Sequence, residues 1–140
     1  MIEGAELEKM DLEETYLHAS SSYQAGKYKL ALASFHILIG ARPYNAHAWQ
    51  GLAACYLMLG EYKNAHQAAL VTHSIMPESD DVKLLLVEAA IMAETIMTGA
   101  ELDDCNTLLK SIVASQITSH NNAIAKKREH LYFLLEQRHP

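Results

Sequence analysis

One residue pattern recurs along the first half of the chain at a fixed interval. Gly26 has a counterpart in Gly60, and other identical residues keep the same interval. Laying residues 12–45 over residues 46–79 aligns Ala19 with Ala53, Gly26 with Gly60, Tyr28 with Tyr62, Lys29 with Lys63, Ala31 with Ala65 and Pro43 with Pro77. Because repeats of about 20–50 residues are typical of stacked supersecondary units, we expect the chain to build one such unit per repeat.

The repeated residues suit a hairpin of two helices. Gly26 and Gly60 supply the left-handed residue that closes the first helix, small alanines let the two helices approach, and the prolines stop the second helix. The interval between the copies, about 34 residues, is the tetratricopeptide length. The second copy carries the signature residues of that repeat at Trp49, Leu52, Ala53, Tyr56, Gly60, Tyr62, Ala65 and Pro77. We expect Trp49 and Tyr56 to pack inside the second hairpin.

The rest of the chain extends the same pattern. A third copy is expected at 80–117, with its glycine late, at Gly99 rather than position 94, which predicts a longer first helix and a turn near Gly99. A closing helix is expected at about 119–137. No stretch alternates apolar and polar residues as a strand does. The sequence therefore predicts an all-α tetratricopeptide-repeat superhelix of about three helical hairpins plus a C-terminal capping helix, forming one domain over residues 1–140.

Composition excludes several classes of partner. A net charge of -6 and a pI of about 5.7 do not suit a protein that neutralises phosphates, so nucleic acid is not expected as a partner. The acidic N-terminus lacks the apolar core of a signal peptide, and no window approaches about eighteen apolar residues, so no membrane insertion is expected. Cys55 and Cys105 are expected to be buried free thiols in a reducing compartment. We expect a cytoplasmic protein.

The polar residues form no recognisable catalytic or metal-binding arrangement. His66 and His73 are seven residues apart, whereas a metal pair on a helix needs a spacing of three or four with a carboxylate close by. The sequence has no nucleophile elbow and no phosphate-binding loop. We therefore expect no enzyme activity, no metal and no cofactor.

Binding by a concave groove is the function that such a superhelix offers. In tetratricopeptide-repeat proteins, set positions on the first helix of each repeat line this groove. Here these positions hold the candidate protein-binding residues Tyr16, Ser20, Tyr23, Gln24, His47, Gln50, Ala54, Leu57, Met58, Leu84, Glu88 and Ile91. A clamp for acidic C-terminal tails needs Lys and Asn where the first repeat has Tyr16 and Ser20, so that binding mode is not expected.

Part of the sequence resembles a narrower family. The spacing of Tyr16, Tyr23, Gln24, Gly26, Lys27 and Tyr28, followed by "GLAAC" at residues 51–55, is similar to the tetratricopeptide chaperones of bacterial type III secretion that hold hydrophobic translocator proteins. The resemblance covers about residues 12–78. It implies a secreted translocator protein as the partner. A short extended segment of that partner is expected in the groove, with Tyr16 and Tyr23 as anchors, which keeps it soluble and ready for export.

The sequence is also compatible with two other functions. The chain is also compatible with a chaperone for the needle subunit of the same secretion apparatus, which would cradle an amphipathic helix. It is equally compatible with an adaptor that joins two protein partners and has no chaperone duty. A homodimer is compatible with all three interpretations.

Overall fold

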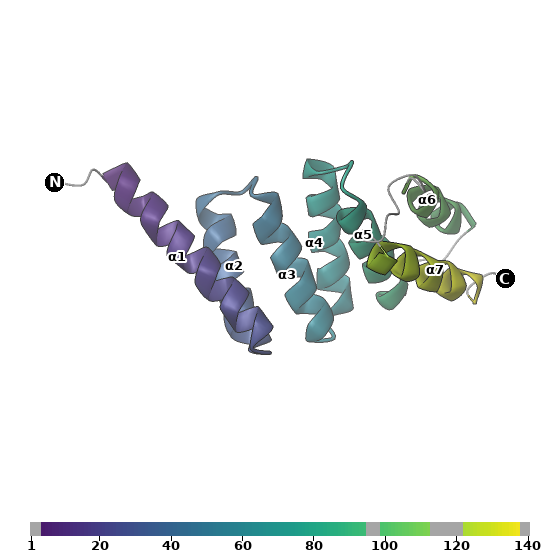
Figure 1. The fold of residues 1–140 in the computed structure, drawn as a ribbon, viewed down its shortest axis with the longest axis horizontal. Coiled ribbons are helices and arrows are strands. Elements are labelled where there is room, and N and C mark those ends of the chain that lie inside the picture. Colours follow the sequence, from purple (N-terminus) through teal and green to yellow (C-terminus); the bar gives the residue numbers. More distant parts are fainter. Residues whose placement is uncertain (1–3, 95–98, 113–121, 138–140) are drawn as a thin grey trace.

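The computed structural model describes residues 4–94, 99–112 and 122–137. Within these ranges the chain forms helices and no strand, which confirms the expected all-α class. The helices follow one another along an elongated row (Figure 1). They are α1 (Gly4–Gln24), α2 (Tyr28–Ala41), α3 (Ala46–Met58), α4 (Tyr62–Ile75), α5 (Asp80–Met92), α6 (Gly99–Lys110) and α7 (Asn122–Glu136).

The first two hairpins turn at the glycines that the repeat marks. Gly26 has φ +78° and Gly60 has φ +75°, so both lie in the left-handed region. Each glycine is followed by the same closing hydrogen bond: the Lys27 amide donates to the Ser22 carbonyl at 2.8 Å, and the Glu61 amide donates to the Tyr56 carbonyl at 2.9 Å. The first helices of the two repeats therefore end in the same cap, at equivalent positions.

Replacing Gly60 by valine should lower the free energy of unfolding by about 1 kcal/mol or more, because a β-branched residue resists a positive φ. Chemical denaturation of both proteins measures this difference. Gly40→Val is a suitable control, since Gly40 lies in α2 with a negative φ and open space around it. An equal loss for the two variants would contradict the role of backbone conformation at Gly60.

The third hairpin departs from the expectation at its turn. α5 and α3 have the same length, 13 residues each, so the predicted longer helix is wrong. Glu94 follows Gly60 by the same interval that separates Gly26 from Gly60, so it occupies the equivalent position of the third repeat. It takes the left-handed conformation, with φ +55°. Gly99 instead begins α6, five residues after Glu94, whereas α4 begins two residues after Gly60. A non-glycine residue tolerates this conformation at a cost of about 1–2 kcal/mol. The left-handed residue of the third repeat is therefore at the position expected from Gly26 and Gly60, although this position holds no glycine.

Alanines and leucines divide between two hydrophobic cores. The first core joins α1 to α5, and the alanines expected at helix contacts, Ala19, Ala31, Ala53 and Ala65, are fully buried in it. The second core joins α5, α6 and α7 and contains Leu84, Val87, Ala90, Ile91, Leu102, Cys105, Leu109, Ile112, Leu131 and Leu135. α5 contributes to both cores and is therefore the helix that connects the repeats to the C-terminal helices.

Trp49 joins the first repeat to the second. Its indole is partly buried against the first core, and its Nε1 donates a hydrogen bond of 2.7 Å to the carbonyl of Pro43 in the turn before α3. Tyr56 is also partly buried and its hydroxyl lies 3.2 Å from Nε2 of His36 in α2. Both side chains thus make a polar contact with a residue of the first repeat, and both are partly buried against a core that includes the second hairpin.

The two thiols are buried in different cores. Cys55 belongs to the first core and Cys105 to the second, and both are free, as expected from the sequence. Burial raises the pKa of each thiol to about 11. Since the thiolate is the reactive form, both cysteines are protonated and unreactive at neutral pH.

Candidate functional site

A cavity of about 260 Å³ lies between α1 and α3. Its lining includes seven of the residues proposed from the groove positions: Tyr16, Ser20, Tyr23 and Gln24 from α1, and His47, Gln50 and Ala54 from α3. Phe35 of α2 and Gly51 of α3 complete the lining. The cavity thus offers aromatic faces, two side-chain amides, an imidazole and three hydroxyls to a ligand. This mixture suits a peptide with both apolar side chains and a polar backbone.

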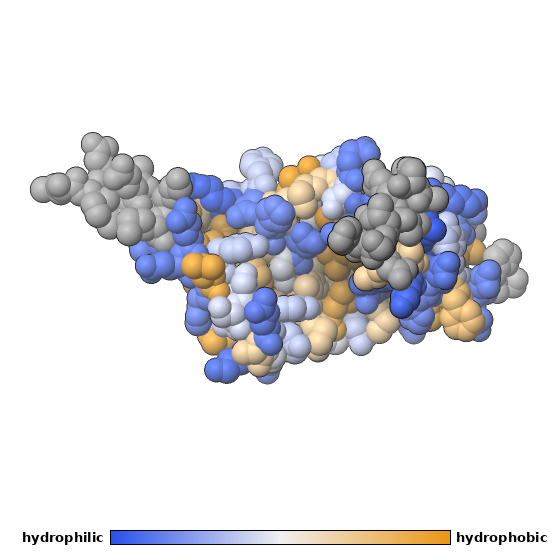
Figure 2. All heavy atoms as spheres, in the orientation of Figure 1, coloured by the Kyte–Doolittle hydropathy of each residue, from blue (hydrophilic) through white to orange (hydrophobic). Residues whose placement is uncertain are grey.

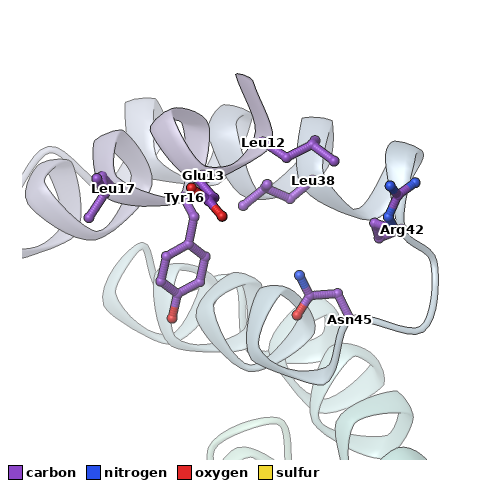
Figure 3. Close-up of a pocket in the computed structure, with 7 residues that line it drawn as sticks. All are labelled: Leu12, Glu13, Tyr16, Leu17, Leu38, Arg42 and Asn45. Atoms are coloured by element: carbon purple, nitrogen blue, oxygen red, sulfur yellow. The ribbon is translucent and has the colours of Figure 1, made fainter. Parts of the chain in front are cut away.

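Tyr16 stands at the boundary of this cavity. Its side chain is 38% exposed, and its ring meets Phe35 edge to face, with ring centroids 6.4 Å apart. Such aromatic contacts fix the orientation of a ring while leaving its other face free. In Figure 3 the Tyr16 side chain extends from α1 toward α3. It is therefore held in a position where a partner can pack against it.

Tyr23 is more firmly held than Tyr16. It is partly buried against the first core, and its ring lies 5.3 Å from that of Tyr28, inclined at 66°. Burial raises the pKa of the Tyr23 phenol, with further contributions from Tyr28, Cys55 and Glu88. The hydroxyl is therefore protonated at neutral pH and available as a hydrogen-bond donor.

Gly51 is a lining residue that the groove positions did not include. A Cβ atom at this position would lie 2.3–2.7 Å from three ring atoms of Phe35. Only glycine lets the Phe35 ring lie this close to α3, and that ring in turn contacts Tyr16. The signal in the sequence was a glycine inside a helix, where alanine would be more stable by about 1 kcal/mol.

Gly51→Ala should lower the free energy of unfolding by about 1–3 kcal/mol, because the buried Phe35 ring must move to admit a methyl group. Gly40→Ala is the matched control: Gly40 is also helical but has no atom near its added Cβ. That variant should be stabilised by up to about 1 kcal/mol. Urea unfolding of both variants measures the difference, and stabilisation of both would show that Phe35 imposes no constraint on Gly51.

A larger cavity, of about 520 Å³, adjoins the first one at Tyr16, which lines both (Figure 3). Its walls come from the middle of α1, from the last turn of α2 and its C-cap, and from the N-cap of α3. The residues that line it are Leu12, Glu13, Tyr16, Leu17, Leu38, Arg42 and Asn45. Most of these residues fall outside the groove positions of the repeat, so the sequence did not predict them.

Two further groove candidates lie at the end of α3. Leu57 is partly buried against the first core, whereas Met58 is 53% exposed. Neither is among the residues that line the two cavities. Their part in binding remains a prediction.

The third repeat does not continue the groove as expected. Leu84 and Ile91 are only 3% and 1% exposed, because they pack in the second core with Leu131 and Leu135 of α7. Glu88 is paired with Lys127 of α7, with 2.6 Å between the charged atoms. Figure 1 shows α7 lying across α5. The interpretation of Leu84 and Ile91 as groove surface is therefore wrong, since the capping helix buries them.

The face that carries α7 in Figure 1 is chemically mixed. Hydrophobic patches lie among hydrophilic side chains on the view of this face in Figure 2. Among the described residues, no helix is long and apolar enough to cross a membrane. Over the same part of the chain, no three histidine, cysteine or acidic side chains come together as metal ligands would.

Comparison with known proteins identifies the class of fold. A family model of the tetratricopeptide repeat matches residues 22–72. Together with the repeated hairpins, this match confirms the tetratricopeptide-repeat fold. No curated protein matches the chain in sequence.

Solved structures with the same fold include secretion chaperones. PcrH of Pseudomonas aeruginosa, in complex with the chaperone binding region of PopD, is 23% identical, with a TM-score of 0.76 over 99% of this chain and 100% of PcrH. The Yersinia enterocolitica type III secretion chaperone SycD, in complex with a peptide of the translocator YopD, is 19% identical, with a TM-score of 0.73 over 91% of this chain and 94% of SycD. The resemblance seen in the sequence is thus confirmed at the level of the fold.

The same fold also occurs in a different setting. The TPR2B domain of yeast Sti1, solved in a complex with pHsp70, is 17% identical, with a TM-score of 0.75 over 93% of this chain and 99% of the domain. Fold alone therefore does not separate these binding functions, and the side chains of the groove must do so.

Proposed function

We propose that this chain is a cytoplasmic type III secretion chaperone that binds a segment of a secreted translocator protein in its groove and keeps that protein soluble and competent for export. The observation that carries the proposal is the cavity between α1 and α3, where Tyr16 and Tyr23 lie beside Gln24 and Gln50. This function needs no catalytic group, metal or cofactor. PcrH and SycD, which were solved with translocator segments, share the fold and support the proposal.

The groove residues suit an extended segment. Tyr16 and Tyr23 are seven residues apart on α1, which separates them by about 10 Å along the helix. An extended chain advances about 3.3 Å per residue, so client side chains about three residues apart would reach both rings. The amides of Gln24 and Gln50 are placed to hydrogen-bond the client backbone.

α7 covers part of the third repeat and so limits the length of the contact between the groove and the client segment. Because α7 buries Leu84 and Ile91, the client segment is expected to run over α1 and α3 rather than across α5. The larger cavity beyond Tyr16 extends the available surface toward the first half of α1. A segment with spaced apolar residues, rather than a long amphipathic helix, fits this arrangement.

Co-expression with a translocator protein of the same bacterium tests the proposal. A chaperone should raise the soluble fraction and the half-life of the translocator, and the two should co-purify. An adaptor would leave both proteins soluble alone, and a needle-subunit chaperone would stabilise the needle subunit instead. Either of these two outcomes, or the absence of a complex, would contradict the proposal.

A further inference from the structure

A third cavity, of about 210 Å³, lies among α4, α5 and α6. Its buried lining is apolar and consists of Leu86 and Ala90 of α5 and Cys105 of α6. Leu70 of α4 also lines it and is 47% exposed, so the cavity opens to the surface. It shares no lining residue with the two cavities described above. A ligand can therefore bind here while the groove is occupied.

A leucine stands beside this cavity where the first two repeats have an alanine. Ala31 and Ala65 occupy the same place in α2 and α4, counted from the start of each helix, and both are fully buried. The same place in α6 holds Leu102, which is also buried. Because leucine is larger than alanine, it holds α6 further from α5, and α6 packs less closely against α5 than α4 packs against α3. This difference accounts for the space among the three helices.

The polar lining of the cavity is acidic. Glu101 and Asp104 lie three residues apart and so are neighbours on α6, and the described residues that line the cavity include no lysine or arginine. The pKa of the Cys105 thiol is raised by burial and, in addition, by these two carboxylates, which places their charge next to the buried lining. Burial lowers the pKa of His66, the remaining polar lining residue, so its imidazole is neutral at neutral pH. The cavity therefore carries a net negative charge.

The first two repeats show that the fold does not require these carboxylates. The equivalent positions, counted from the start of each helix, are Leu30 and Ala33 in α2 and Asn64 and Gln67 in α4. Glu101 also lies in the first turn of α6, where a carboxylate stabilises the helix dipole. Asp104 lies beyond that turn. Its charge is therefore the better one to test for a role in binding.

We propose that this cavity binds an arginine side chain of a second protein partner, in addition to the client in the groove. The cavity is smaller than the roughly 300–1,000 Å³ of pockets for drug-sized ligands, and its size suits a single side chain. The methylene groups of an arginine would pack against Leu70 and Leu86, and its guanidinium would reach the two carboxylates. Arginine fits better than lysine because its planar group donates to two carboxylates at once and is more weakly hydrated. This site does not depend on the proposed function of the groove.

NMR titration of the full chain with a capped glycine–serine peptide that carries one central arginine tests the proposal. Amide signals of residues 66–70, 86–90 and 101–108 should shift, with a dissociation constant of about 1 mM, as expected for a single side chain. The same peptide with citrulline, which has nearly the same shape but no charge, should bind at least about tenfold more weakly. Equal binding of the citrulline peptide, or no shift with the arginine peptide, overturns the proposal. Tighter binding of free arginine than of the peptide would assign the cavity to a small molecule and would also overturn it.

Two neighbouring aspartates provide a matched pair of variants. Asp104→Asn should weaken binding of the arginine peptide at least about fivefold, since it removes a charge from the cavity. Asp103→Asn removes the same charge from the next residue of α6, which is exposed and does not line the cavity, and should leave binding unchanged. Equal effects of the two variants would mean that the peptide responds only to the overall negative charge of the protein, which contradicts a site in the cavity.

Two leucines test the apolar part of the contact. Leu70→Ala should weaken binding of the arginine peptide at least about twofold, because the methylene groups of the arginine lose a wall of the cavity. Leu30→Ala is the control, since Leu30 is 46% exposed, close to the 47% of Leu70, but lies in α2 away from the cavity. Equal binding by the two variants would contradict burial of the side chain in the cavity. Circular dichroism melts should show that both variants fold.

Discussion

Leu131→Ala is expected to lower the free energy of unfolding by about 2–5 kcal/mol. Leu131 is 1% exposed and packs in the second core with Leu84, Ile91 and Leu135, so its truncation leaves a cavity between α7 and α5. Urea denaturation followed by circular dichroism measures the loss. The same variant should bind a hydrophobic dye more strongly, because loosening of α7 uncovers Leu84 and Ile91.

Phe133→Ala is the matched control for this result. Phe133 lies two residues further along α7 and is 56% exposed, so its truncation should cost less than about 1 kcal/mol. Equal losses for the two variants would mean that α7 does not seal the second core through Leu131.

Replacing Tyr16 and Tyr23 together by alanine should remove about 2–4 kcal/mol of affinity for the translocator segment. Tyrosine offers a broad apolar face and a hydroxyl with few rotatable bonds, which suits an anchor residue. Isothermal titration calorimetry with the segment as a peptide measures the change. Tyr44→Ala is the control, because Tyr44 is 86% exposed and lies outside the groove cavity.

Stability measurements must accompany the tyrosine variants. Tyr16 is partly exposed, so Tyr16→Ala alone should barely shift the melting temperature, whereas Tyr23 also packs against the first core. Tyr23→Phe keeps that packing and removes only the hydroxyl. Unchanged affinity in the double variant, or an affinity loss that only follows unfolding, would assign these tyrosines to the core instead of the groove.

The repeat made most of the fold predictable. Gly26 and Gly60 have backbone conformations that other residues adopt at a cost, so their spacing located two turns correctly. The same reasoning failed at the third turn, because Glu94 adopts a positive φ without any mark in the sequence. Local signals thus located turns only where the residue type was constrained.

The groove was predictable in part. Residues on α1 and α3, such as Tyr16 and Gln50, were located because their faces follow from the register of the repeat. Leu84 and Ile91 obey the same register but are covered by α7, and the position of a capping helix depends on contacts between residues far apart in the sequence. The role of Gly51 depends on the ring of Phe35, which is likewise a tertiary contact.

Hydrogen exchange of the whole chain, with and without the translocator segment, tests the groove most directly. Binding as proposed should slow amide exchange in residues 16–24 of α1 and 47–54 of α3, because the ligand stabilises the helices that it contacts. Exchange in α4 and α6 should change little. Slower exchange confined to α4 or α6, with no change in α1 and α3, would contradict binding of the segment in the groove between α1 and α3.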